Sequence, residues 1–126
     1  PKAIQLAKQR LATAAHVEFM QQRIPNEFPN GSFDLIVVSE ILYYLSKDEV
    51  TACLEQIKTT LSKEGVVLSC HWRYPIEGFE LNGNTVHELL RTELDLHHSF
   101  SLTDPDFVLD IWTHHPASVA QQEGLL

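Results

Sequence analysis

The stretch from Phe33 to Leu45 constrains the fold of this chain more than any other sequence feature. Its Leu35–Val38 run is apolar at every position. Such a run is typical of a strand in a parallel sheet that helices cover on both faces. Ser39 and Glu40 follow directly, so a hydroxyl and a carboxylate stand at the carboxyl end of the predicted strand. Open α/β sheets bind ligands at this edge, and we therefore place the candidate site there.

A helix and a second strand complete a predicted parallel unit. Ser46 and Glu49 match a capping box, in which each side chain accepts a bond from a backbone amide at the helix start. The apolar spacing predicts a helix from about Lys47 to Leu61, and Gly65 is placed to end its last turn. Val66–Cys70 is a second apolar run. Because strand, helix and strand in this order form a βαβ unit, we expect the two strands to be parallel neighbours.

The remaining elements are predicted from periodicity and turn signals. Pro1–Leu11 has the apolar spacing of a helix, and Val17–Met20 alternates as a short strand does. A further helix is expected over Thr85–Leu94, capped by its first residue and Glu88.

The C-terminal part predicts a hairpin followed by a tail. Leu96–Leu102 and Phe107–Thr113 flank a turn-forming cluster that contains Asp104 and Pro105, which indicates an antiparallel hairpin. Residues 116–126 have little pattern and are expected to be a loosely ordered tail.

Length, charge and composition narrow the classes of partner. With 126 residues, the chain is expected to be one domain. Its formal net charge of -8 opposes a phosphate backbone, which argues against nucleic-acid partners. No apolar run approaches the roughly 20 residues of a membrane span, and no signal peptide is recognisable, so no membrane association is expected. Cys53 and Cys70 fit neither a disulfide framework nor a metal motif, which favours a reducing, cytoplasmic location.

The order of predicted elements resembles the later part of a class I S-adenosylmethionine-dependent methyltransferase. The Phe33–Leu45 stretch is similar to the fourth-strand motif of that family, commonly Phe-Asp-Leu-Ile followed by Ser-Glu-Val-Leu. Its double tyrosine resembles the nodulation-factor N-methyltransferase branch (nodulation protein S-like), which methylates an amino sugar on a chitooligosaccharide. Leu61–Gly65 resembles the Leu-x-Pro-Gly-Gly turn before the fifth strand, with Lys63 and Glu64 in place of Pro and Gly. Pro1–Arg10 is similar to the helix after the acidic second strand, so the resemblance covers essentially the whole chain.

This resemblance implies a fold and a cofactor. The fold is α/β: a truncated, Rossmann-like methyltransferase sheet of parallel strands with a C-terminal antiparallel hairpin, and residues 1–126 are a partial methyltransferase domain. The implied cofactor is S-adenosyl-L-methionine. The glycine-rich loop and the acidic residue that holds the ribose are missing from the chain. We therefore expect an incomplete cofactor site, and a chain that is the later portion of a larger enzyme and inactive alone.

Two residues are candidates for the chemistry of methyl transfer, in which the protein mainly positions donor and acceptor. Glu40 stands where a carboxylate could hold the cationic end of the cofactor or take a proton from an amine acceptor. Equally, it could be a solvated or helix-capping carboxylate. His71 follows the second strand and is a candidate general base, because the reference pKa of histidine lies near neutrality. The alternative for the polar run that begins at His71 is a strand end covered by amphipathic side chains.

The resemblance also implies binding residues. Candidate cofactor contacts are Met20, Gln21, Ile24, Ser39, Glu40 and Leu45. Candidate contacts for a small polar acceptor are Tyr43, Tyr44, Trp72, Arg73 and Tyr74. Aromatic rings offer apolar area and a polar tip to such an acceptor, although at least one of the two adjacent tyrosines is expected to pack beneath the following helix.

Histidine pairs at 97–98 and 114–115 raise the question of a metal site. Adjacent residues of a strand point to opposite faces, so neither pair can chelate one ion as a unit. No His-Glu-x-x-His motif or cysteine partner accompanies them. We therefore predict surface histidines and no metal.

A rival to the enzyme hypothesis is a methyltransferase-like module that acts through self-association or a partner subunit. In the family, the missing strands separate the Val17–Met20 strand from the central one. We therefore expect that strand either to move next to the central strand or to leave an edge that a homodimer covers.

Overall fold

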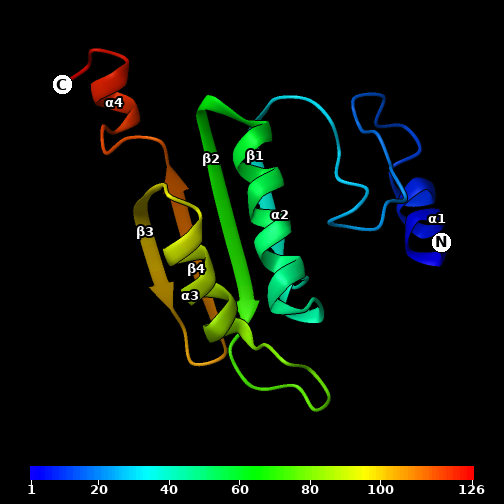
Figure 1. The fold of residues 1–126 in the computed structure, drawn as a ribbon. Coiled ribbons are helices and arrows are strands. Elements are labelled where there is room, and N and C mark those ends of the chain that lie inside the picture. The colour runs from blue at the N-terminus through cyan, green and yellow to red at the C-terminus, as the bar shows by residue number, and fades with distance from the viewer.

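The computed structural model describes every residue from Pro1 to Leu126. The elements are α1 (Lys2–Arg10), β1 (Phe33–Ser39), the 3-10 helix η1 (Leu42–Tyr44), α2 (Lys47–Thr60), β2 (Leu61–Trp72), α3 (Gly83–Glu93), β3 (His97–Thr103), β4 (Phe107–Thr113) and α4 (Val119–Gln122). The strands form a single sheet in the order β1-β2-β4-β3 (Figure 1). None of the helices combines the length and apolar character needed to span a bilayer.

The predicted parallel unit is confirmed. β1 and β2 pair in parallel with Val37 opposite Leu68, and α2 connects them. Glu49 N donates to Ser46 Oγ at 3.2 Å and Ser46 N donates to Glu49 Oε2 at 2.9 Å, which is the predicted capping box. β3 and β4 form the predicted antiparallel hairpin, and β4 pairs antiparallel with β2.

Gly65 does not end a helical turn as predicted. α2 stops at Thr60, and β2 already begins at Leu61, which pairs with Phe33. The register then shifts before Val66, so Gly65 lies within an irregular stretch of β2. A Cβ at this position would stand 2.5 Å from Leu61 Cδ1. The glycine therefore permits a close approach inside the strand.

One face of the sheet carries the core. Figure 1 shows α2 and α3 on the same side of the strands. The hydrophobic core cluster joins these helices to the sheet and to η1, and it includes Val38, Leu42, Val50, Leu54, Ile57, Val67, Val86, Leu90 and Trp112.

The opposite face is uncovered, contrary to the expectation of helices on both sides. Leu35 and Val37 of β1 are 59% and 56% exposed, and Phe100 and Leu102 of β3 are also exposed.

The first helix, α1, lies away from the sheet (Figure 1). α1 buries none of its residues. Val17–Met20 forms no strand, so that prediction was wrong. An alternating pattern makes a strand only where its amide groups find a partner, and here no neighbour pairs with it. β1 consequently stands at the edge of the sheet.

The cap of α3 differs from the predicted one. Asn82 Oδ1 accepts from Thr85 N at 3.0 Å, and Thr85 Oγ1 accepts from Asn82 N at 2.9 Å. Glu88 instead forms an ion pair with Arg91 on the helix surface. The helix starts earlier than predicted, at Gly83, whose lack of a Cβ allows the close approach of α3 to Trp72 O at the end of β2. In the C-terminal tail, Ser118 and Gln121 cap the short helix α4.

Candidate functional site

Glu40 ties three elements together at the carboxyl ends of β1 and β2. Its backbone adopts φ 57, in the left-handed region. Its N–H donates to Cys70 O at 3.0 Å, and its Oε2 accepts from Trp72 N at 3.2 Å. The same oxygen accepts a short bond from the hydroxyl of Tyr43 in η1. The carboxylate therefore fixes η1 against the end of β2, at the edge where the sequence placed the site.

Tyr43 and Tyr44 have different environments. Tyr43 is buried, and burial together with its bond to Glu40 raises the pKa of its hydroxyl, so it stays protonated and donates. Its ring centroid lies 5.0 Å from that of Tyr44 and 5.4 Å from that of His71. Tyr44 is 59% exposed and packs edge-on against Phe79 at 5.0 Å. One tyrosine is thus a packing residue, as expected, and the other is largely exposed.

The residues after His71 extend the same edge toward the hairpin. Trp72 and Tyr74 are exposed, with ring centroids 5.2 Å apart. Arg73 Nη1 donates to Asp104 O at 2.8 Å, and Tyr74 Oη donates to Pro105 O at 2.9 Å. These bonds hold the turn between β3 and β4 against the end of β2. The Arg73 guanidinium is therefore already engaged, whereas the two rings remain accessible.

His71 does not lie at the open edge, where a general base was expected. Its side chain is fully buried, and its Nε2 accepts from Leu42 N at 3.3 Å. Burial, assisted by the neighbouring His87, lowers its pKa to about 3. A buried imidazole whose acceptor nitrogen is occupied has no lone pair to offer an acceptor substrate. This correction removes His71 from the proton chemistry.

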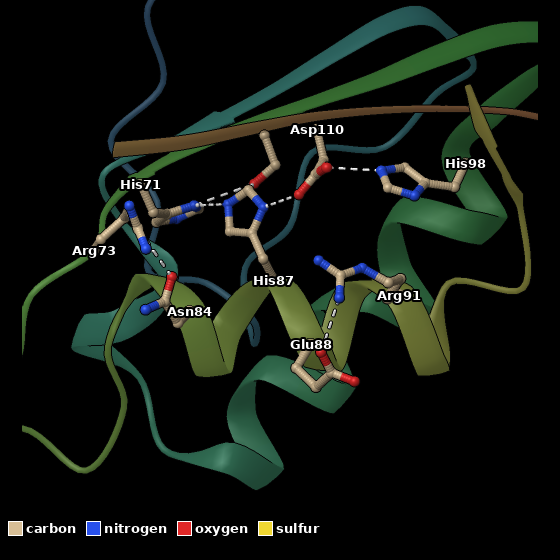
Figure 2. Close-up of polar contacts among 9 residues, drawn as sticks. His71, Arg73, Asn84, His87, Glu88, Arg91, His98 and Asp110 are labelled. Atoms are coloured by element: carbon tan, nitrogen blue, oxygen red, sulfur yellow. Dashed lines mark hydrogen bonds and ion pairs between the residues drawn. The ribbon is translucent and has the colours of Figure 1, made fainter. Parts of the chain in front are cut away.

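A buried polar cluster lies behind His71 (Figure 2). His71 Nδ1 is 3.0 Å from His87 Nε2, and His87 Nδ1 is 2.5 Å from Asp110 Oδ2. His98 Nε2 lies 2.6 Å from the other oxygen of Asp110. Ser69 Oγ stands beside the first contact, 3.2 Å from His71 Nδ1 and 3.5 Å from His87 Nε2.

Electrostatic shifts within the cluster follow from burial and hydrogen bonding. Burial lowers the pKa of His87 despite the neighbouring carboxylate. Burial alone would raise the pKa of Asp110, but hydrogen bonds from Ser101, His87 and His98 hold it below its usual value. Asp110 is therefore ionised and the imidazole of His87 is neutral at pH 7.

Neither this cluster nor Phe79 was predicted from the sequence. One signal was available: Val108, Asp110 and Trp112 share the inward side of β4, so a carboxylate interrupts an apolar face. His98 was predicted to be a surface histidine, but its side chain is only 31% exposed and it pairs with Asp110. Phe79 lies in an irregular loop with no periodic pattern to mark it.

The remaining predicted cofactor contacts are dispersed. Ser39 is exposed beside Glu40, and Leu45 packs against the core. Met20 and Gln21 are exposed in the segment between α1 and β1, and neither makes a hydrogen bond to the sheet edge. Ile24 lines an apolar cavity of about 290 Å³ beside β1. The structure therefore places Ser39 and Glu40 together at the carboxyl end of β1 and leaves the other predicted contacts away from it.

Comparison with known proteins identifies several that are similar to this chain. The profile of the family described as "Methyltransferase domain" matches residues 1–69. A protein from Pseudomonas syringae, described as a methyltransferase, is 40% identical with a TM-score of 0.76, and the match covers 88% of this chain and 66% of that one. The N-methyltransferase NodS from Bradyrhizobium japonicum WM9, solved with S-adenosyl-L-homocysteine, is 23% identical with a TM-score of 0.79, covering 90% and 62%.

Other solved structures are similar to this chain only in their fold. An O-methyltransferase family protein from Burkholderia thailandensis is 13% identical with a TM-score of 0.71, and the match covers 93% of this chain and 41% of that one. Comparison with curated protein sequences gives no match. The chain spans less than two thirds of the length of the Pseudomonas and Bradyrhizobium proteins. The four-stranded sheet thus corresponds to part of a Rossmann-like methyltransferase fold.

Proposed function

Because this chain belongs to the methyltransferase domain family, we propose that it is part of an S-adenosylmethionine-dependent methyltransferase acting on a small polar acceptor. The observation that carries the proposal is the position of Glu40. It lies at the carboxyl edge of a parallel strand pair, where open α/β sheets bind ligands, and its side chain organises η1 and β2 around that edge.

The edge offers part of a cofactor site. Glu40 Oε2 is engaged by Tyr43 and Trp72, while Oε1 makes no hydrogen bond and the side chain is exposed. A free carboxylate oxygen suits a cationic ligand group. Ser39 adds an exposed hydroxyl next to it. S-adenosyl-L-methionine, when bound, supplies the methyl group, and Glu40 with Ser39 would hold its polar end.

The rest of the proposed cofactor site is weaker. Met20, Gln21 and Ile24 would have to approach the edge to form a wall, and Leu45 would contribute from its place in the core. No glycine-rich loop occurs among these residues. We therefore propose that the cofactor site of this chain is incomplete and that the chain alone is inactive.

The acceptor would lie against the exposed rings at the same edge. Tyr44, Trp72 and Tyr74 are exposed, and aromatic rings bind sugars and other amphipathic molecules. Glu40 is the group placed to take a proton from an amine acceptor. NodS is an N-methyltransferase, and the double tyrosine resembles its branch, which supports an amino-sugar acceptor. Tyr43 and Arg73 serve this site by orienting Glu40 and the hairpin turn.

Glu40→Gln tests the proposal, with Glu64→Gln as the matched control. The glutamine keeps the size of Glu40 and an oxygen that accepts from Trp72 N, but it removes the charge. We expect weaker binding of S-adenosylmethionine in Glu40→Gln and unchanged binding in Glu64→Gln, measured by calorimetric titration. Equal affinity in both variants would rule out Glu40 as the cofactor carboxylate.

A second candidate role is self-association through the unpaired edge of β1. The outer edge of β1 has no partner strand, and an apolar cavity lies beside it. An exposed strand edge favours pairing with another strand, so a second copy of this chain would be the occupant. Light scattering of the wild type and of Val37→Lys distinguishes a dimer formed through this edge from a monomer. A dimer that becomes monomeric in Val37→Lys supports this role, and a wild-type monomer excludes it.

A further inference from the structure

The hydrogen bonds of the buried polar cluster behind His71 have one donor direction, which follows from the two ends of the cluster. A backbone N–H can only donate, so His71 Nε2 accepts the bond from Leu42 N. A neutral imidazole carries its single proton on the other nitrogen. His71 therefore holds its proton on Nδ1, the nitrogen that faces His87 at 3.0 Å.

The end of the cluster at Asp110 leads independently to the same proton positions. An ionised carboxylate only accepts, so both histidines that contact Asp110 donate to it. The proton of His87 is thus on Nδ1, which leaves its Nε2 bare. That bare nitrogen is the one that meets the Nδ1–H of His71. The two assignments agree, because His71 Nδ1–H donates and His87 Nε2 accepts at the contact between the histidines. The Ser69 hydroxyl lies within hydrogen-bond distance of both nitrogens.

The result is a chain of donors that all point toward Asp110. Leu42 N donates to His71. His71 donates in turn to His87, and His87 donates to Asp110 (Figure 2). His98, at the outer end, donates to the second carboxylate oxygen. Every buried side-chain polar atom has a partner. A tautomer change at any histidine would set two donors or two acceptors against each other.

Leu42 connects this series of hydrogen bonds to the sheet edge at Glu40. It is the first residue of η1, and the next residue, Tyr43, donates to Glu40. His71 also directly precedes Trp72, whose N–H donates to the same carboxylate. The network therefore reaches both backbone elements that hold the Glu40 side chain.

We infer that His71, His87, Asp110 and His98 form a positioning network that sets the orientation of Glu40 and Tyr43 by fixing the tautomer of His71. The inference rests on the proposed function only in treating Glu40 as a ligand group. Four buried or half-buried polar side chains are an expensive way to fill a core, since apolar residues of equal volume stabilise a fold at least as well. A fixed donor direction is what this arrangement provides and an apolar core does not.

The first test is the tautomer of each histidine in the ligand-free wild-type chain at pH 7. Long-range proton–nitrogen NMR spectra distinguish a protonated ring nitrogen from a bare one. We expect His71 and His87 to be neutral with the proton on Nδ1, and His98 to carry a proton on Nε2. A proton on Nε2 of His71, or a charged His71, would overturn the inference.

The second test compares His87→Leu with His87→Gln, and His97→Gln is the control because His97 is exposed on the same hairpin. Leucine removes the acceptor for His71 and the donor to Asp110, whereas the glutamine amide supplies both. We expect the Leu42 amide and Tyr43 ring resonances to shift in His87→Leu, to return toward wild type in His87→Gln and to stay unchanged in His97→Gln. Lower stability of His87→Leu without these shifts would show a purely structural role.

These measurements remain decisive if a variant fails to fold, because the wild-type tautomers and the glutamine variant settle the donor direction. They also separate this inference from the proposed function. Failure of the chain to bind S-adenosylhomocysteine would count against the cofactor site and leave the NMR result standing. Wild-type affinity in a folded His87→Leu variant would show that the network does not position Glu40.

Discussion

His71 should make the stability of this protein depend on pH between 7 and 5. Its pKa falls from the ordinary 6.5 to about 3 on folding. Below pH 6.5, the unfolded chain takes up a proton on His71 while the folded chain does not, so acid favours unfolding. The stabilisation that results from keeping His71 neutral is fully present above pH 6.5 and is lost as the pH falls toward 3. The loss amounts to about 2 kcal/mol by pH 5 and about 4 kcal/mol by pH 3.

The perturbation that isolates this effect is His71→Gln, because glutamine can accept from Leu42 N and donate to His87 but does not titrate. Urea unfolding at pH 7 and pH 5 gives the free energy of unfolding for each protein. We expect the wild type to lose about 2 kcal/mol more than His71→Gln over this interval. His87, whose pKa is also lowered, contributes to both proteins and cancels in the comparison. An equal loss in the two proteins would refute the burial of a neutral His71.

Two further predictions concern the elements that build the sheet edge. Gly83→Ala should destabilise the protein strongly, because its Cβ would stand 2.0 Å from Trp72 O, and the strain of such overpacking is typically about 1–3 kcal/mol or more. Asn84→Ala, on the exposed side of the same turn, is the control for urea unfolding, and equal stability of the two variants would contradict the close approach of α3 to β2. Ser46→Ala should cost about 1 kcal/mol by thermal or urea unfolding, since it removes the bond from Glu49 N. An unchanged midpoint would mean that the capping box does not stabilise α2.

Local signals predicted the elements that depend on neighbours in sequence. The apolar run at β1, the capping box at Ser46 and the turn cluster before Phe107 each determine their own element, and all three predictions are confirmed. The parallel pairing of β1 with β2 followed because short crossovers leave few alternatives.

Features that depend on distant partners were not predictable in this way. Val17–Met20 has a strand pattern but no partner to pair with, and Gly65 is needed for a close approach rather than for a helix end. His71 was expected to face solvent because it ends an apolar strand, yet α3 covers it and supplies His87. Asp110 in the inward positions of β4 was the visible sign that polar partners would gather there.

Titration with S-adenosylhomocysteine, followed through the backbone amide resonances, tests whether Glu40 lies at a ligand-binding edge. We predict weak binding, with shifts concentrated at Ser39, Glu40 and Trp72 and none near His115, beyond the far end of β4. The absence of shifts at these residues would contradict the location of the site. A dissociation constant below about 1 μM would contradict the proposal that the cofactor site of this chain is incomplete.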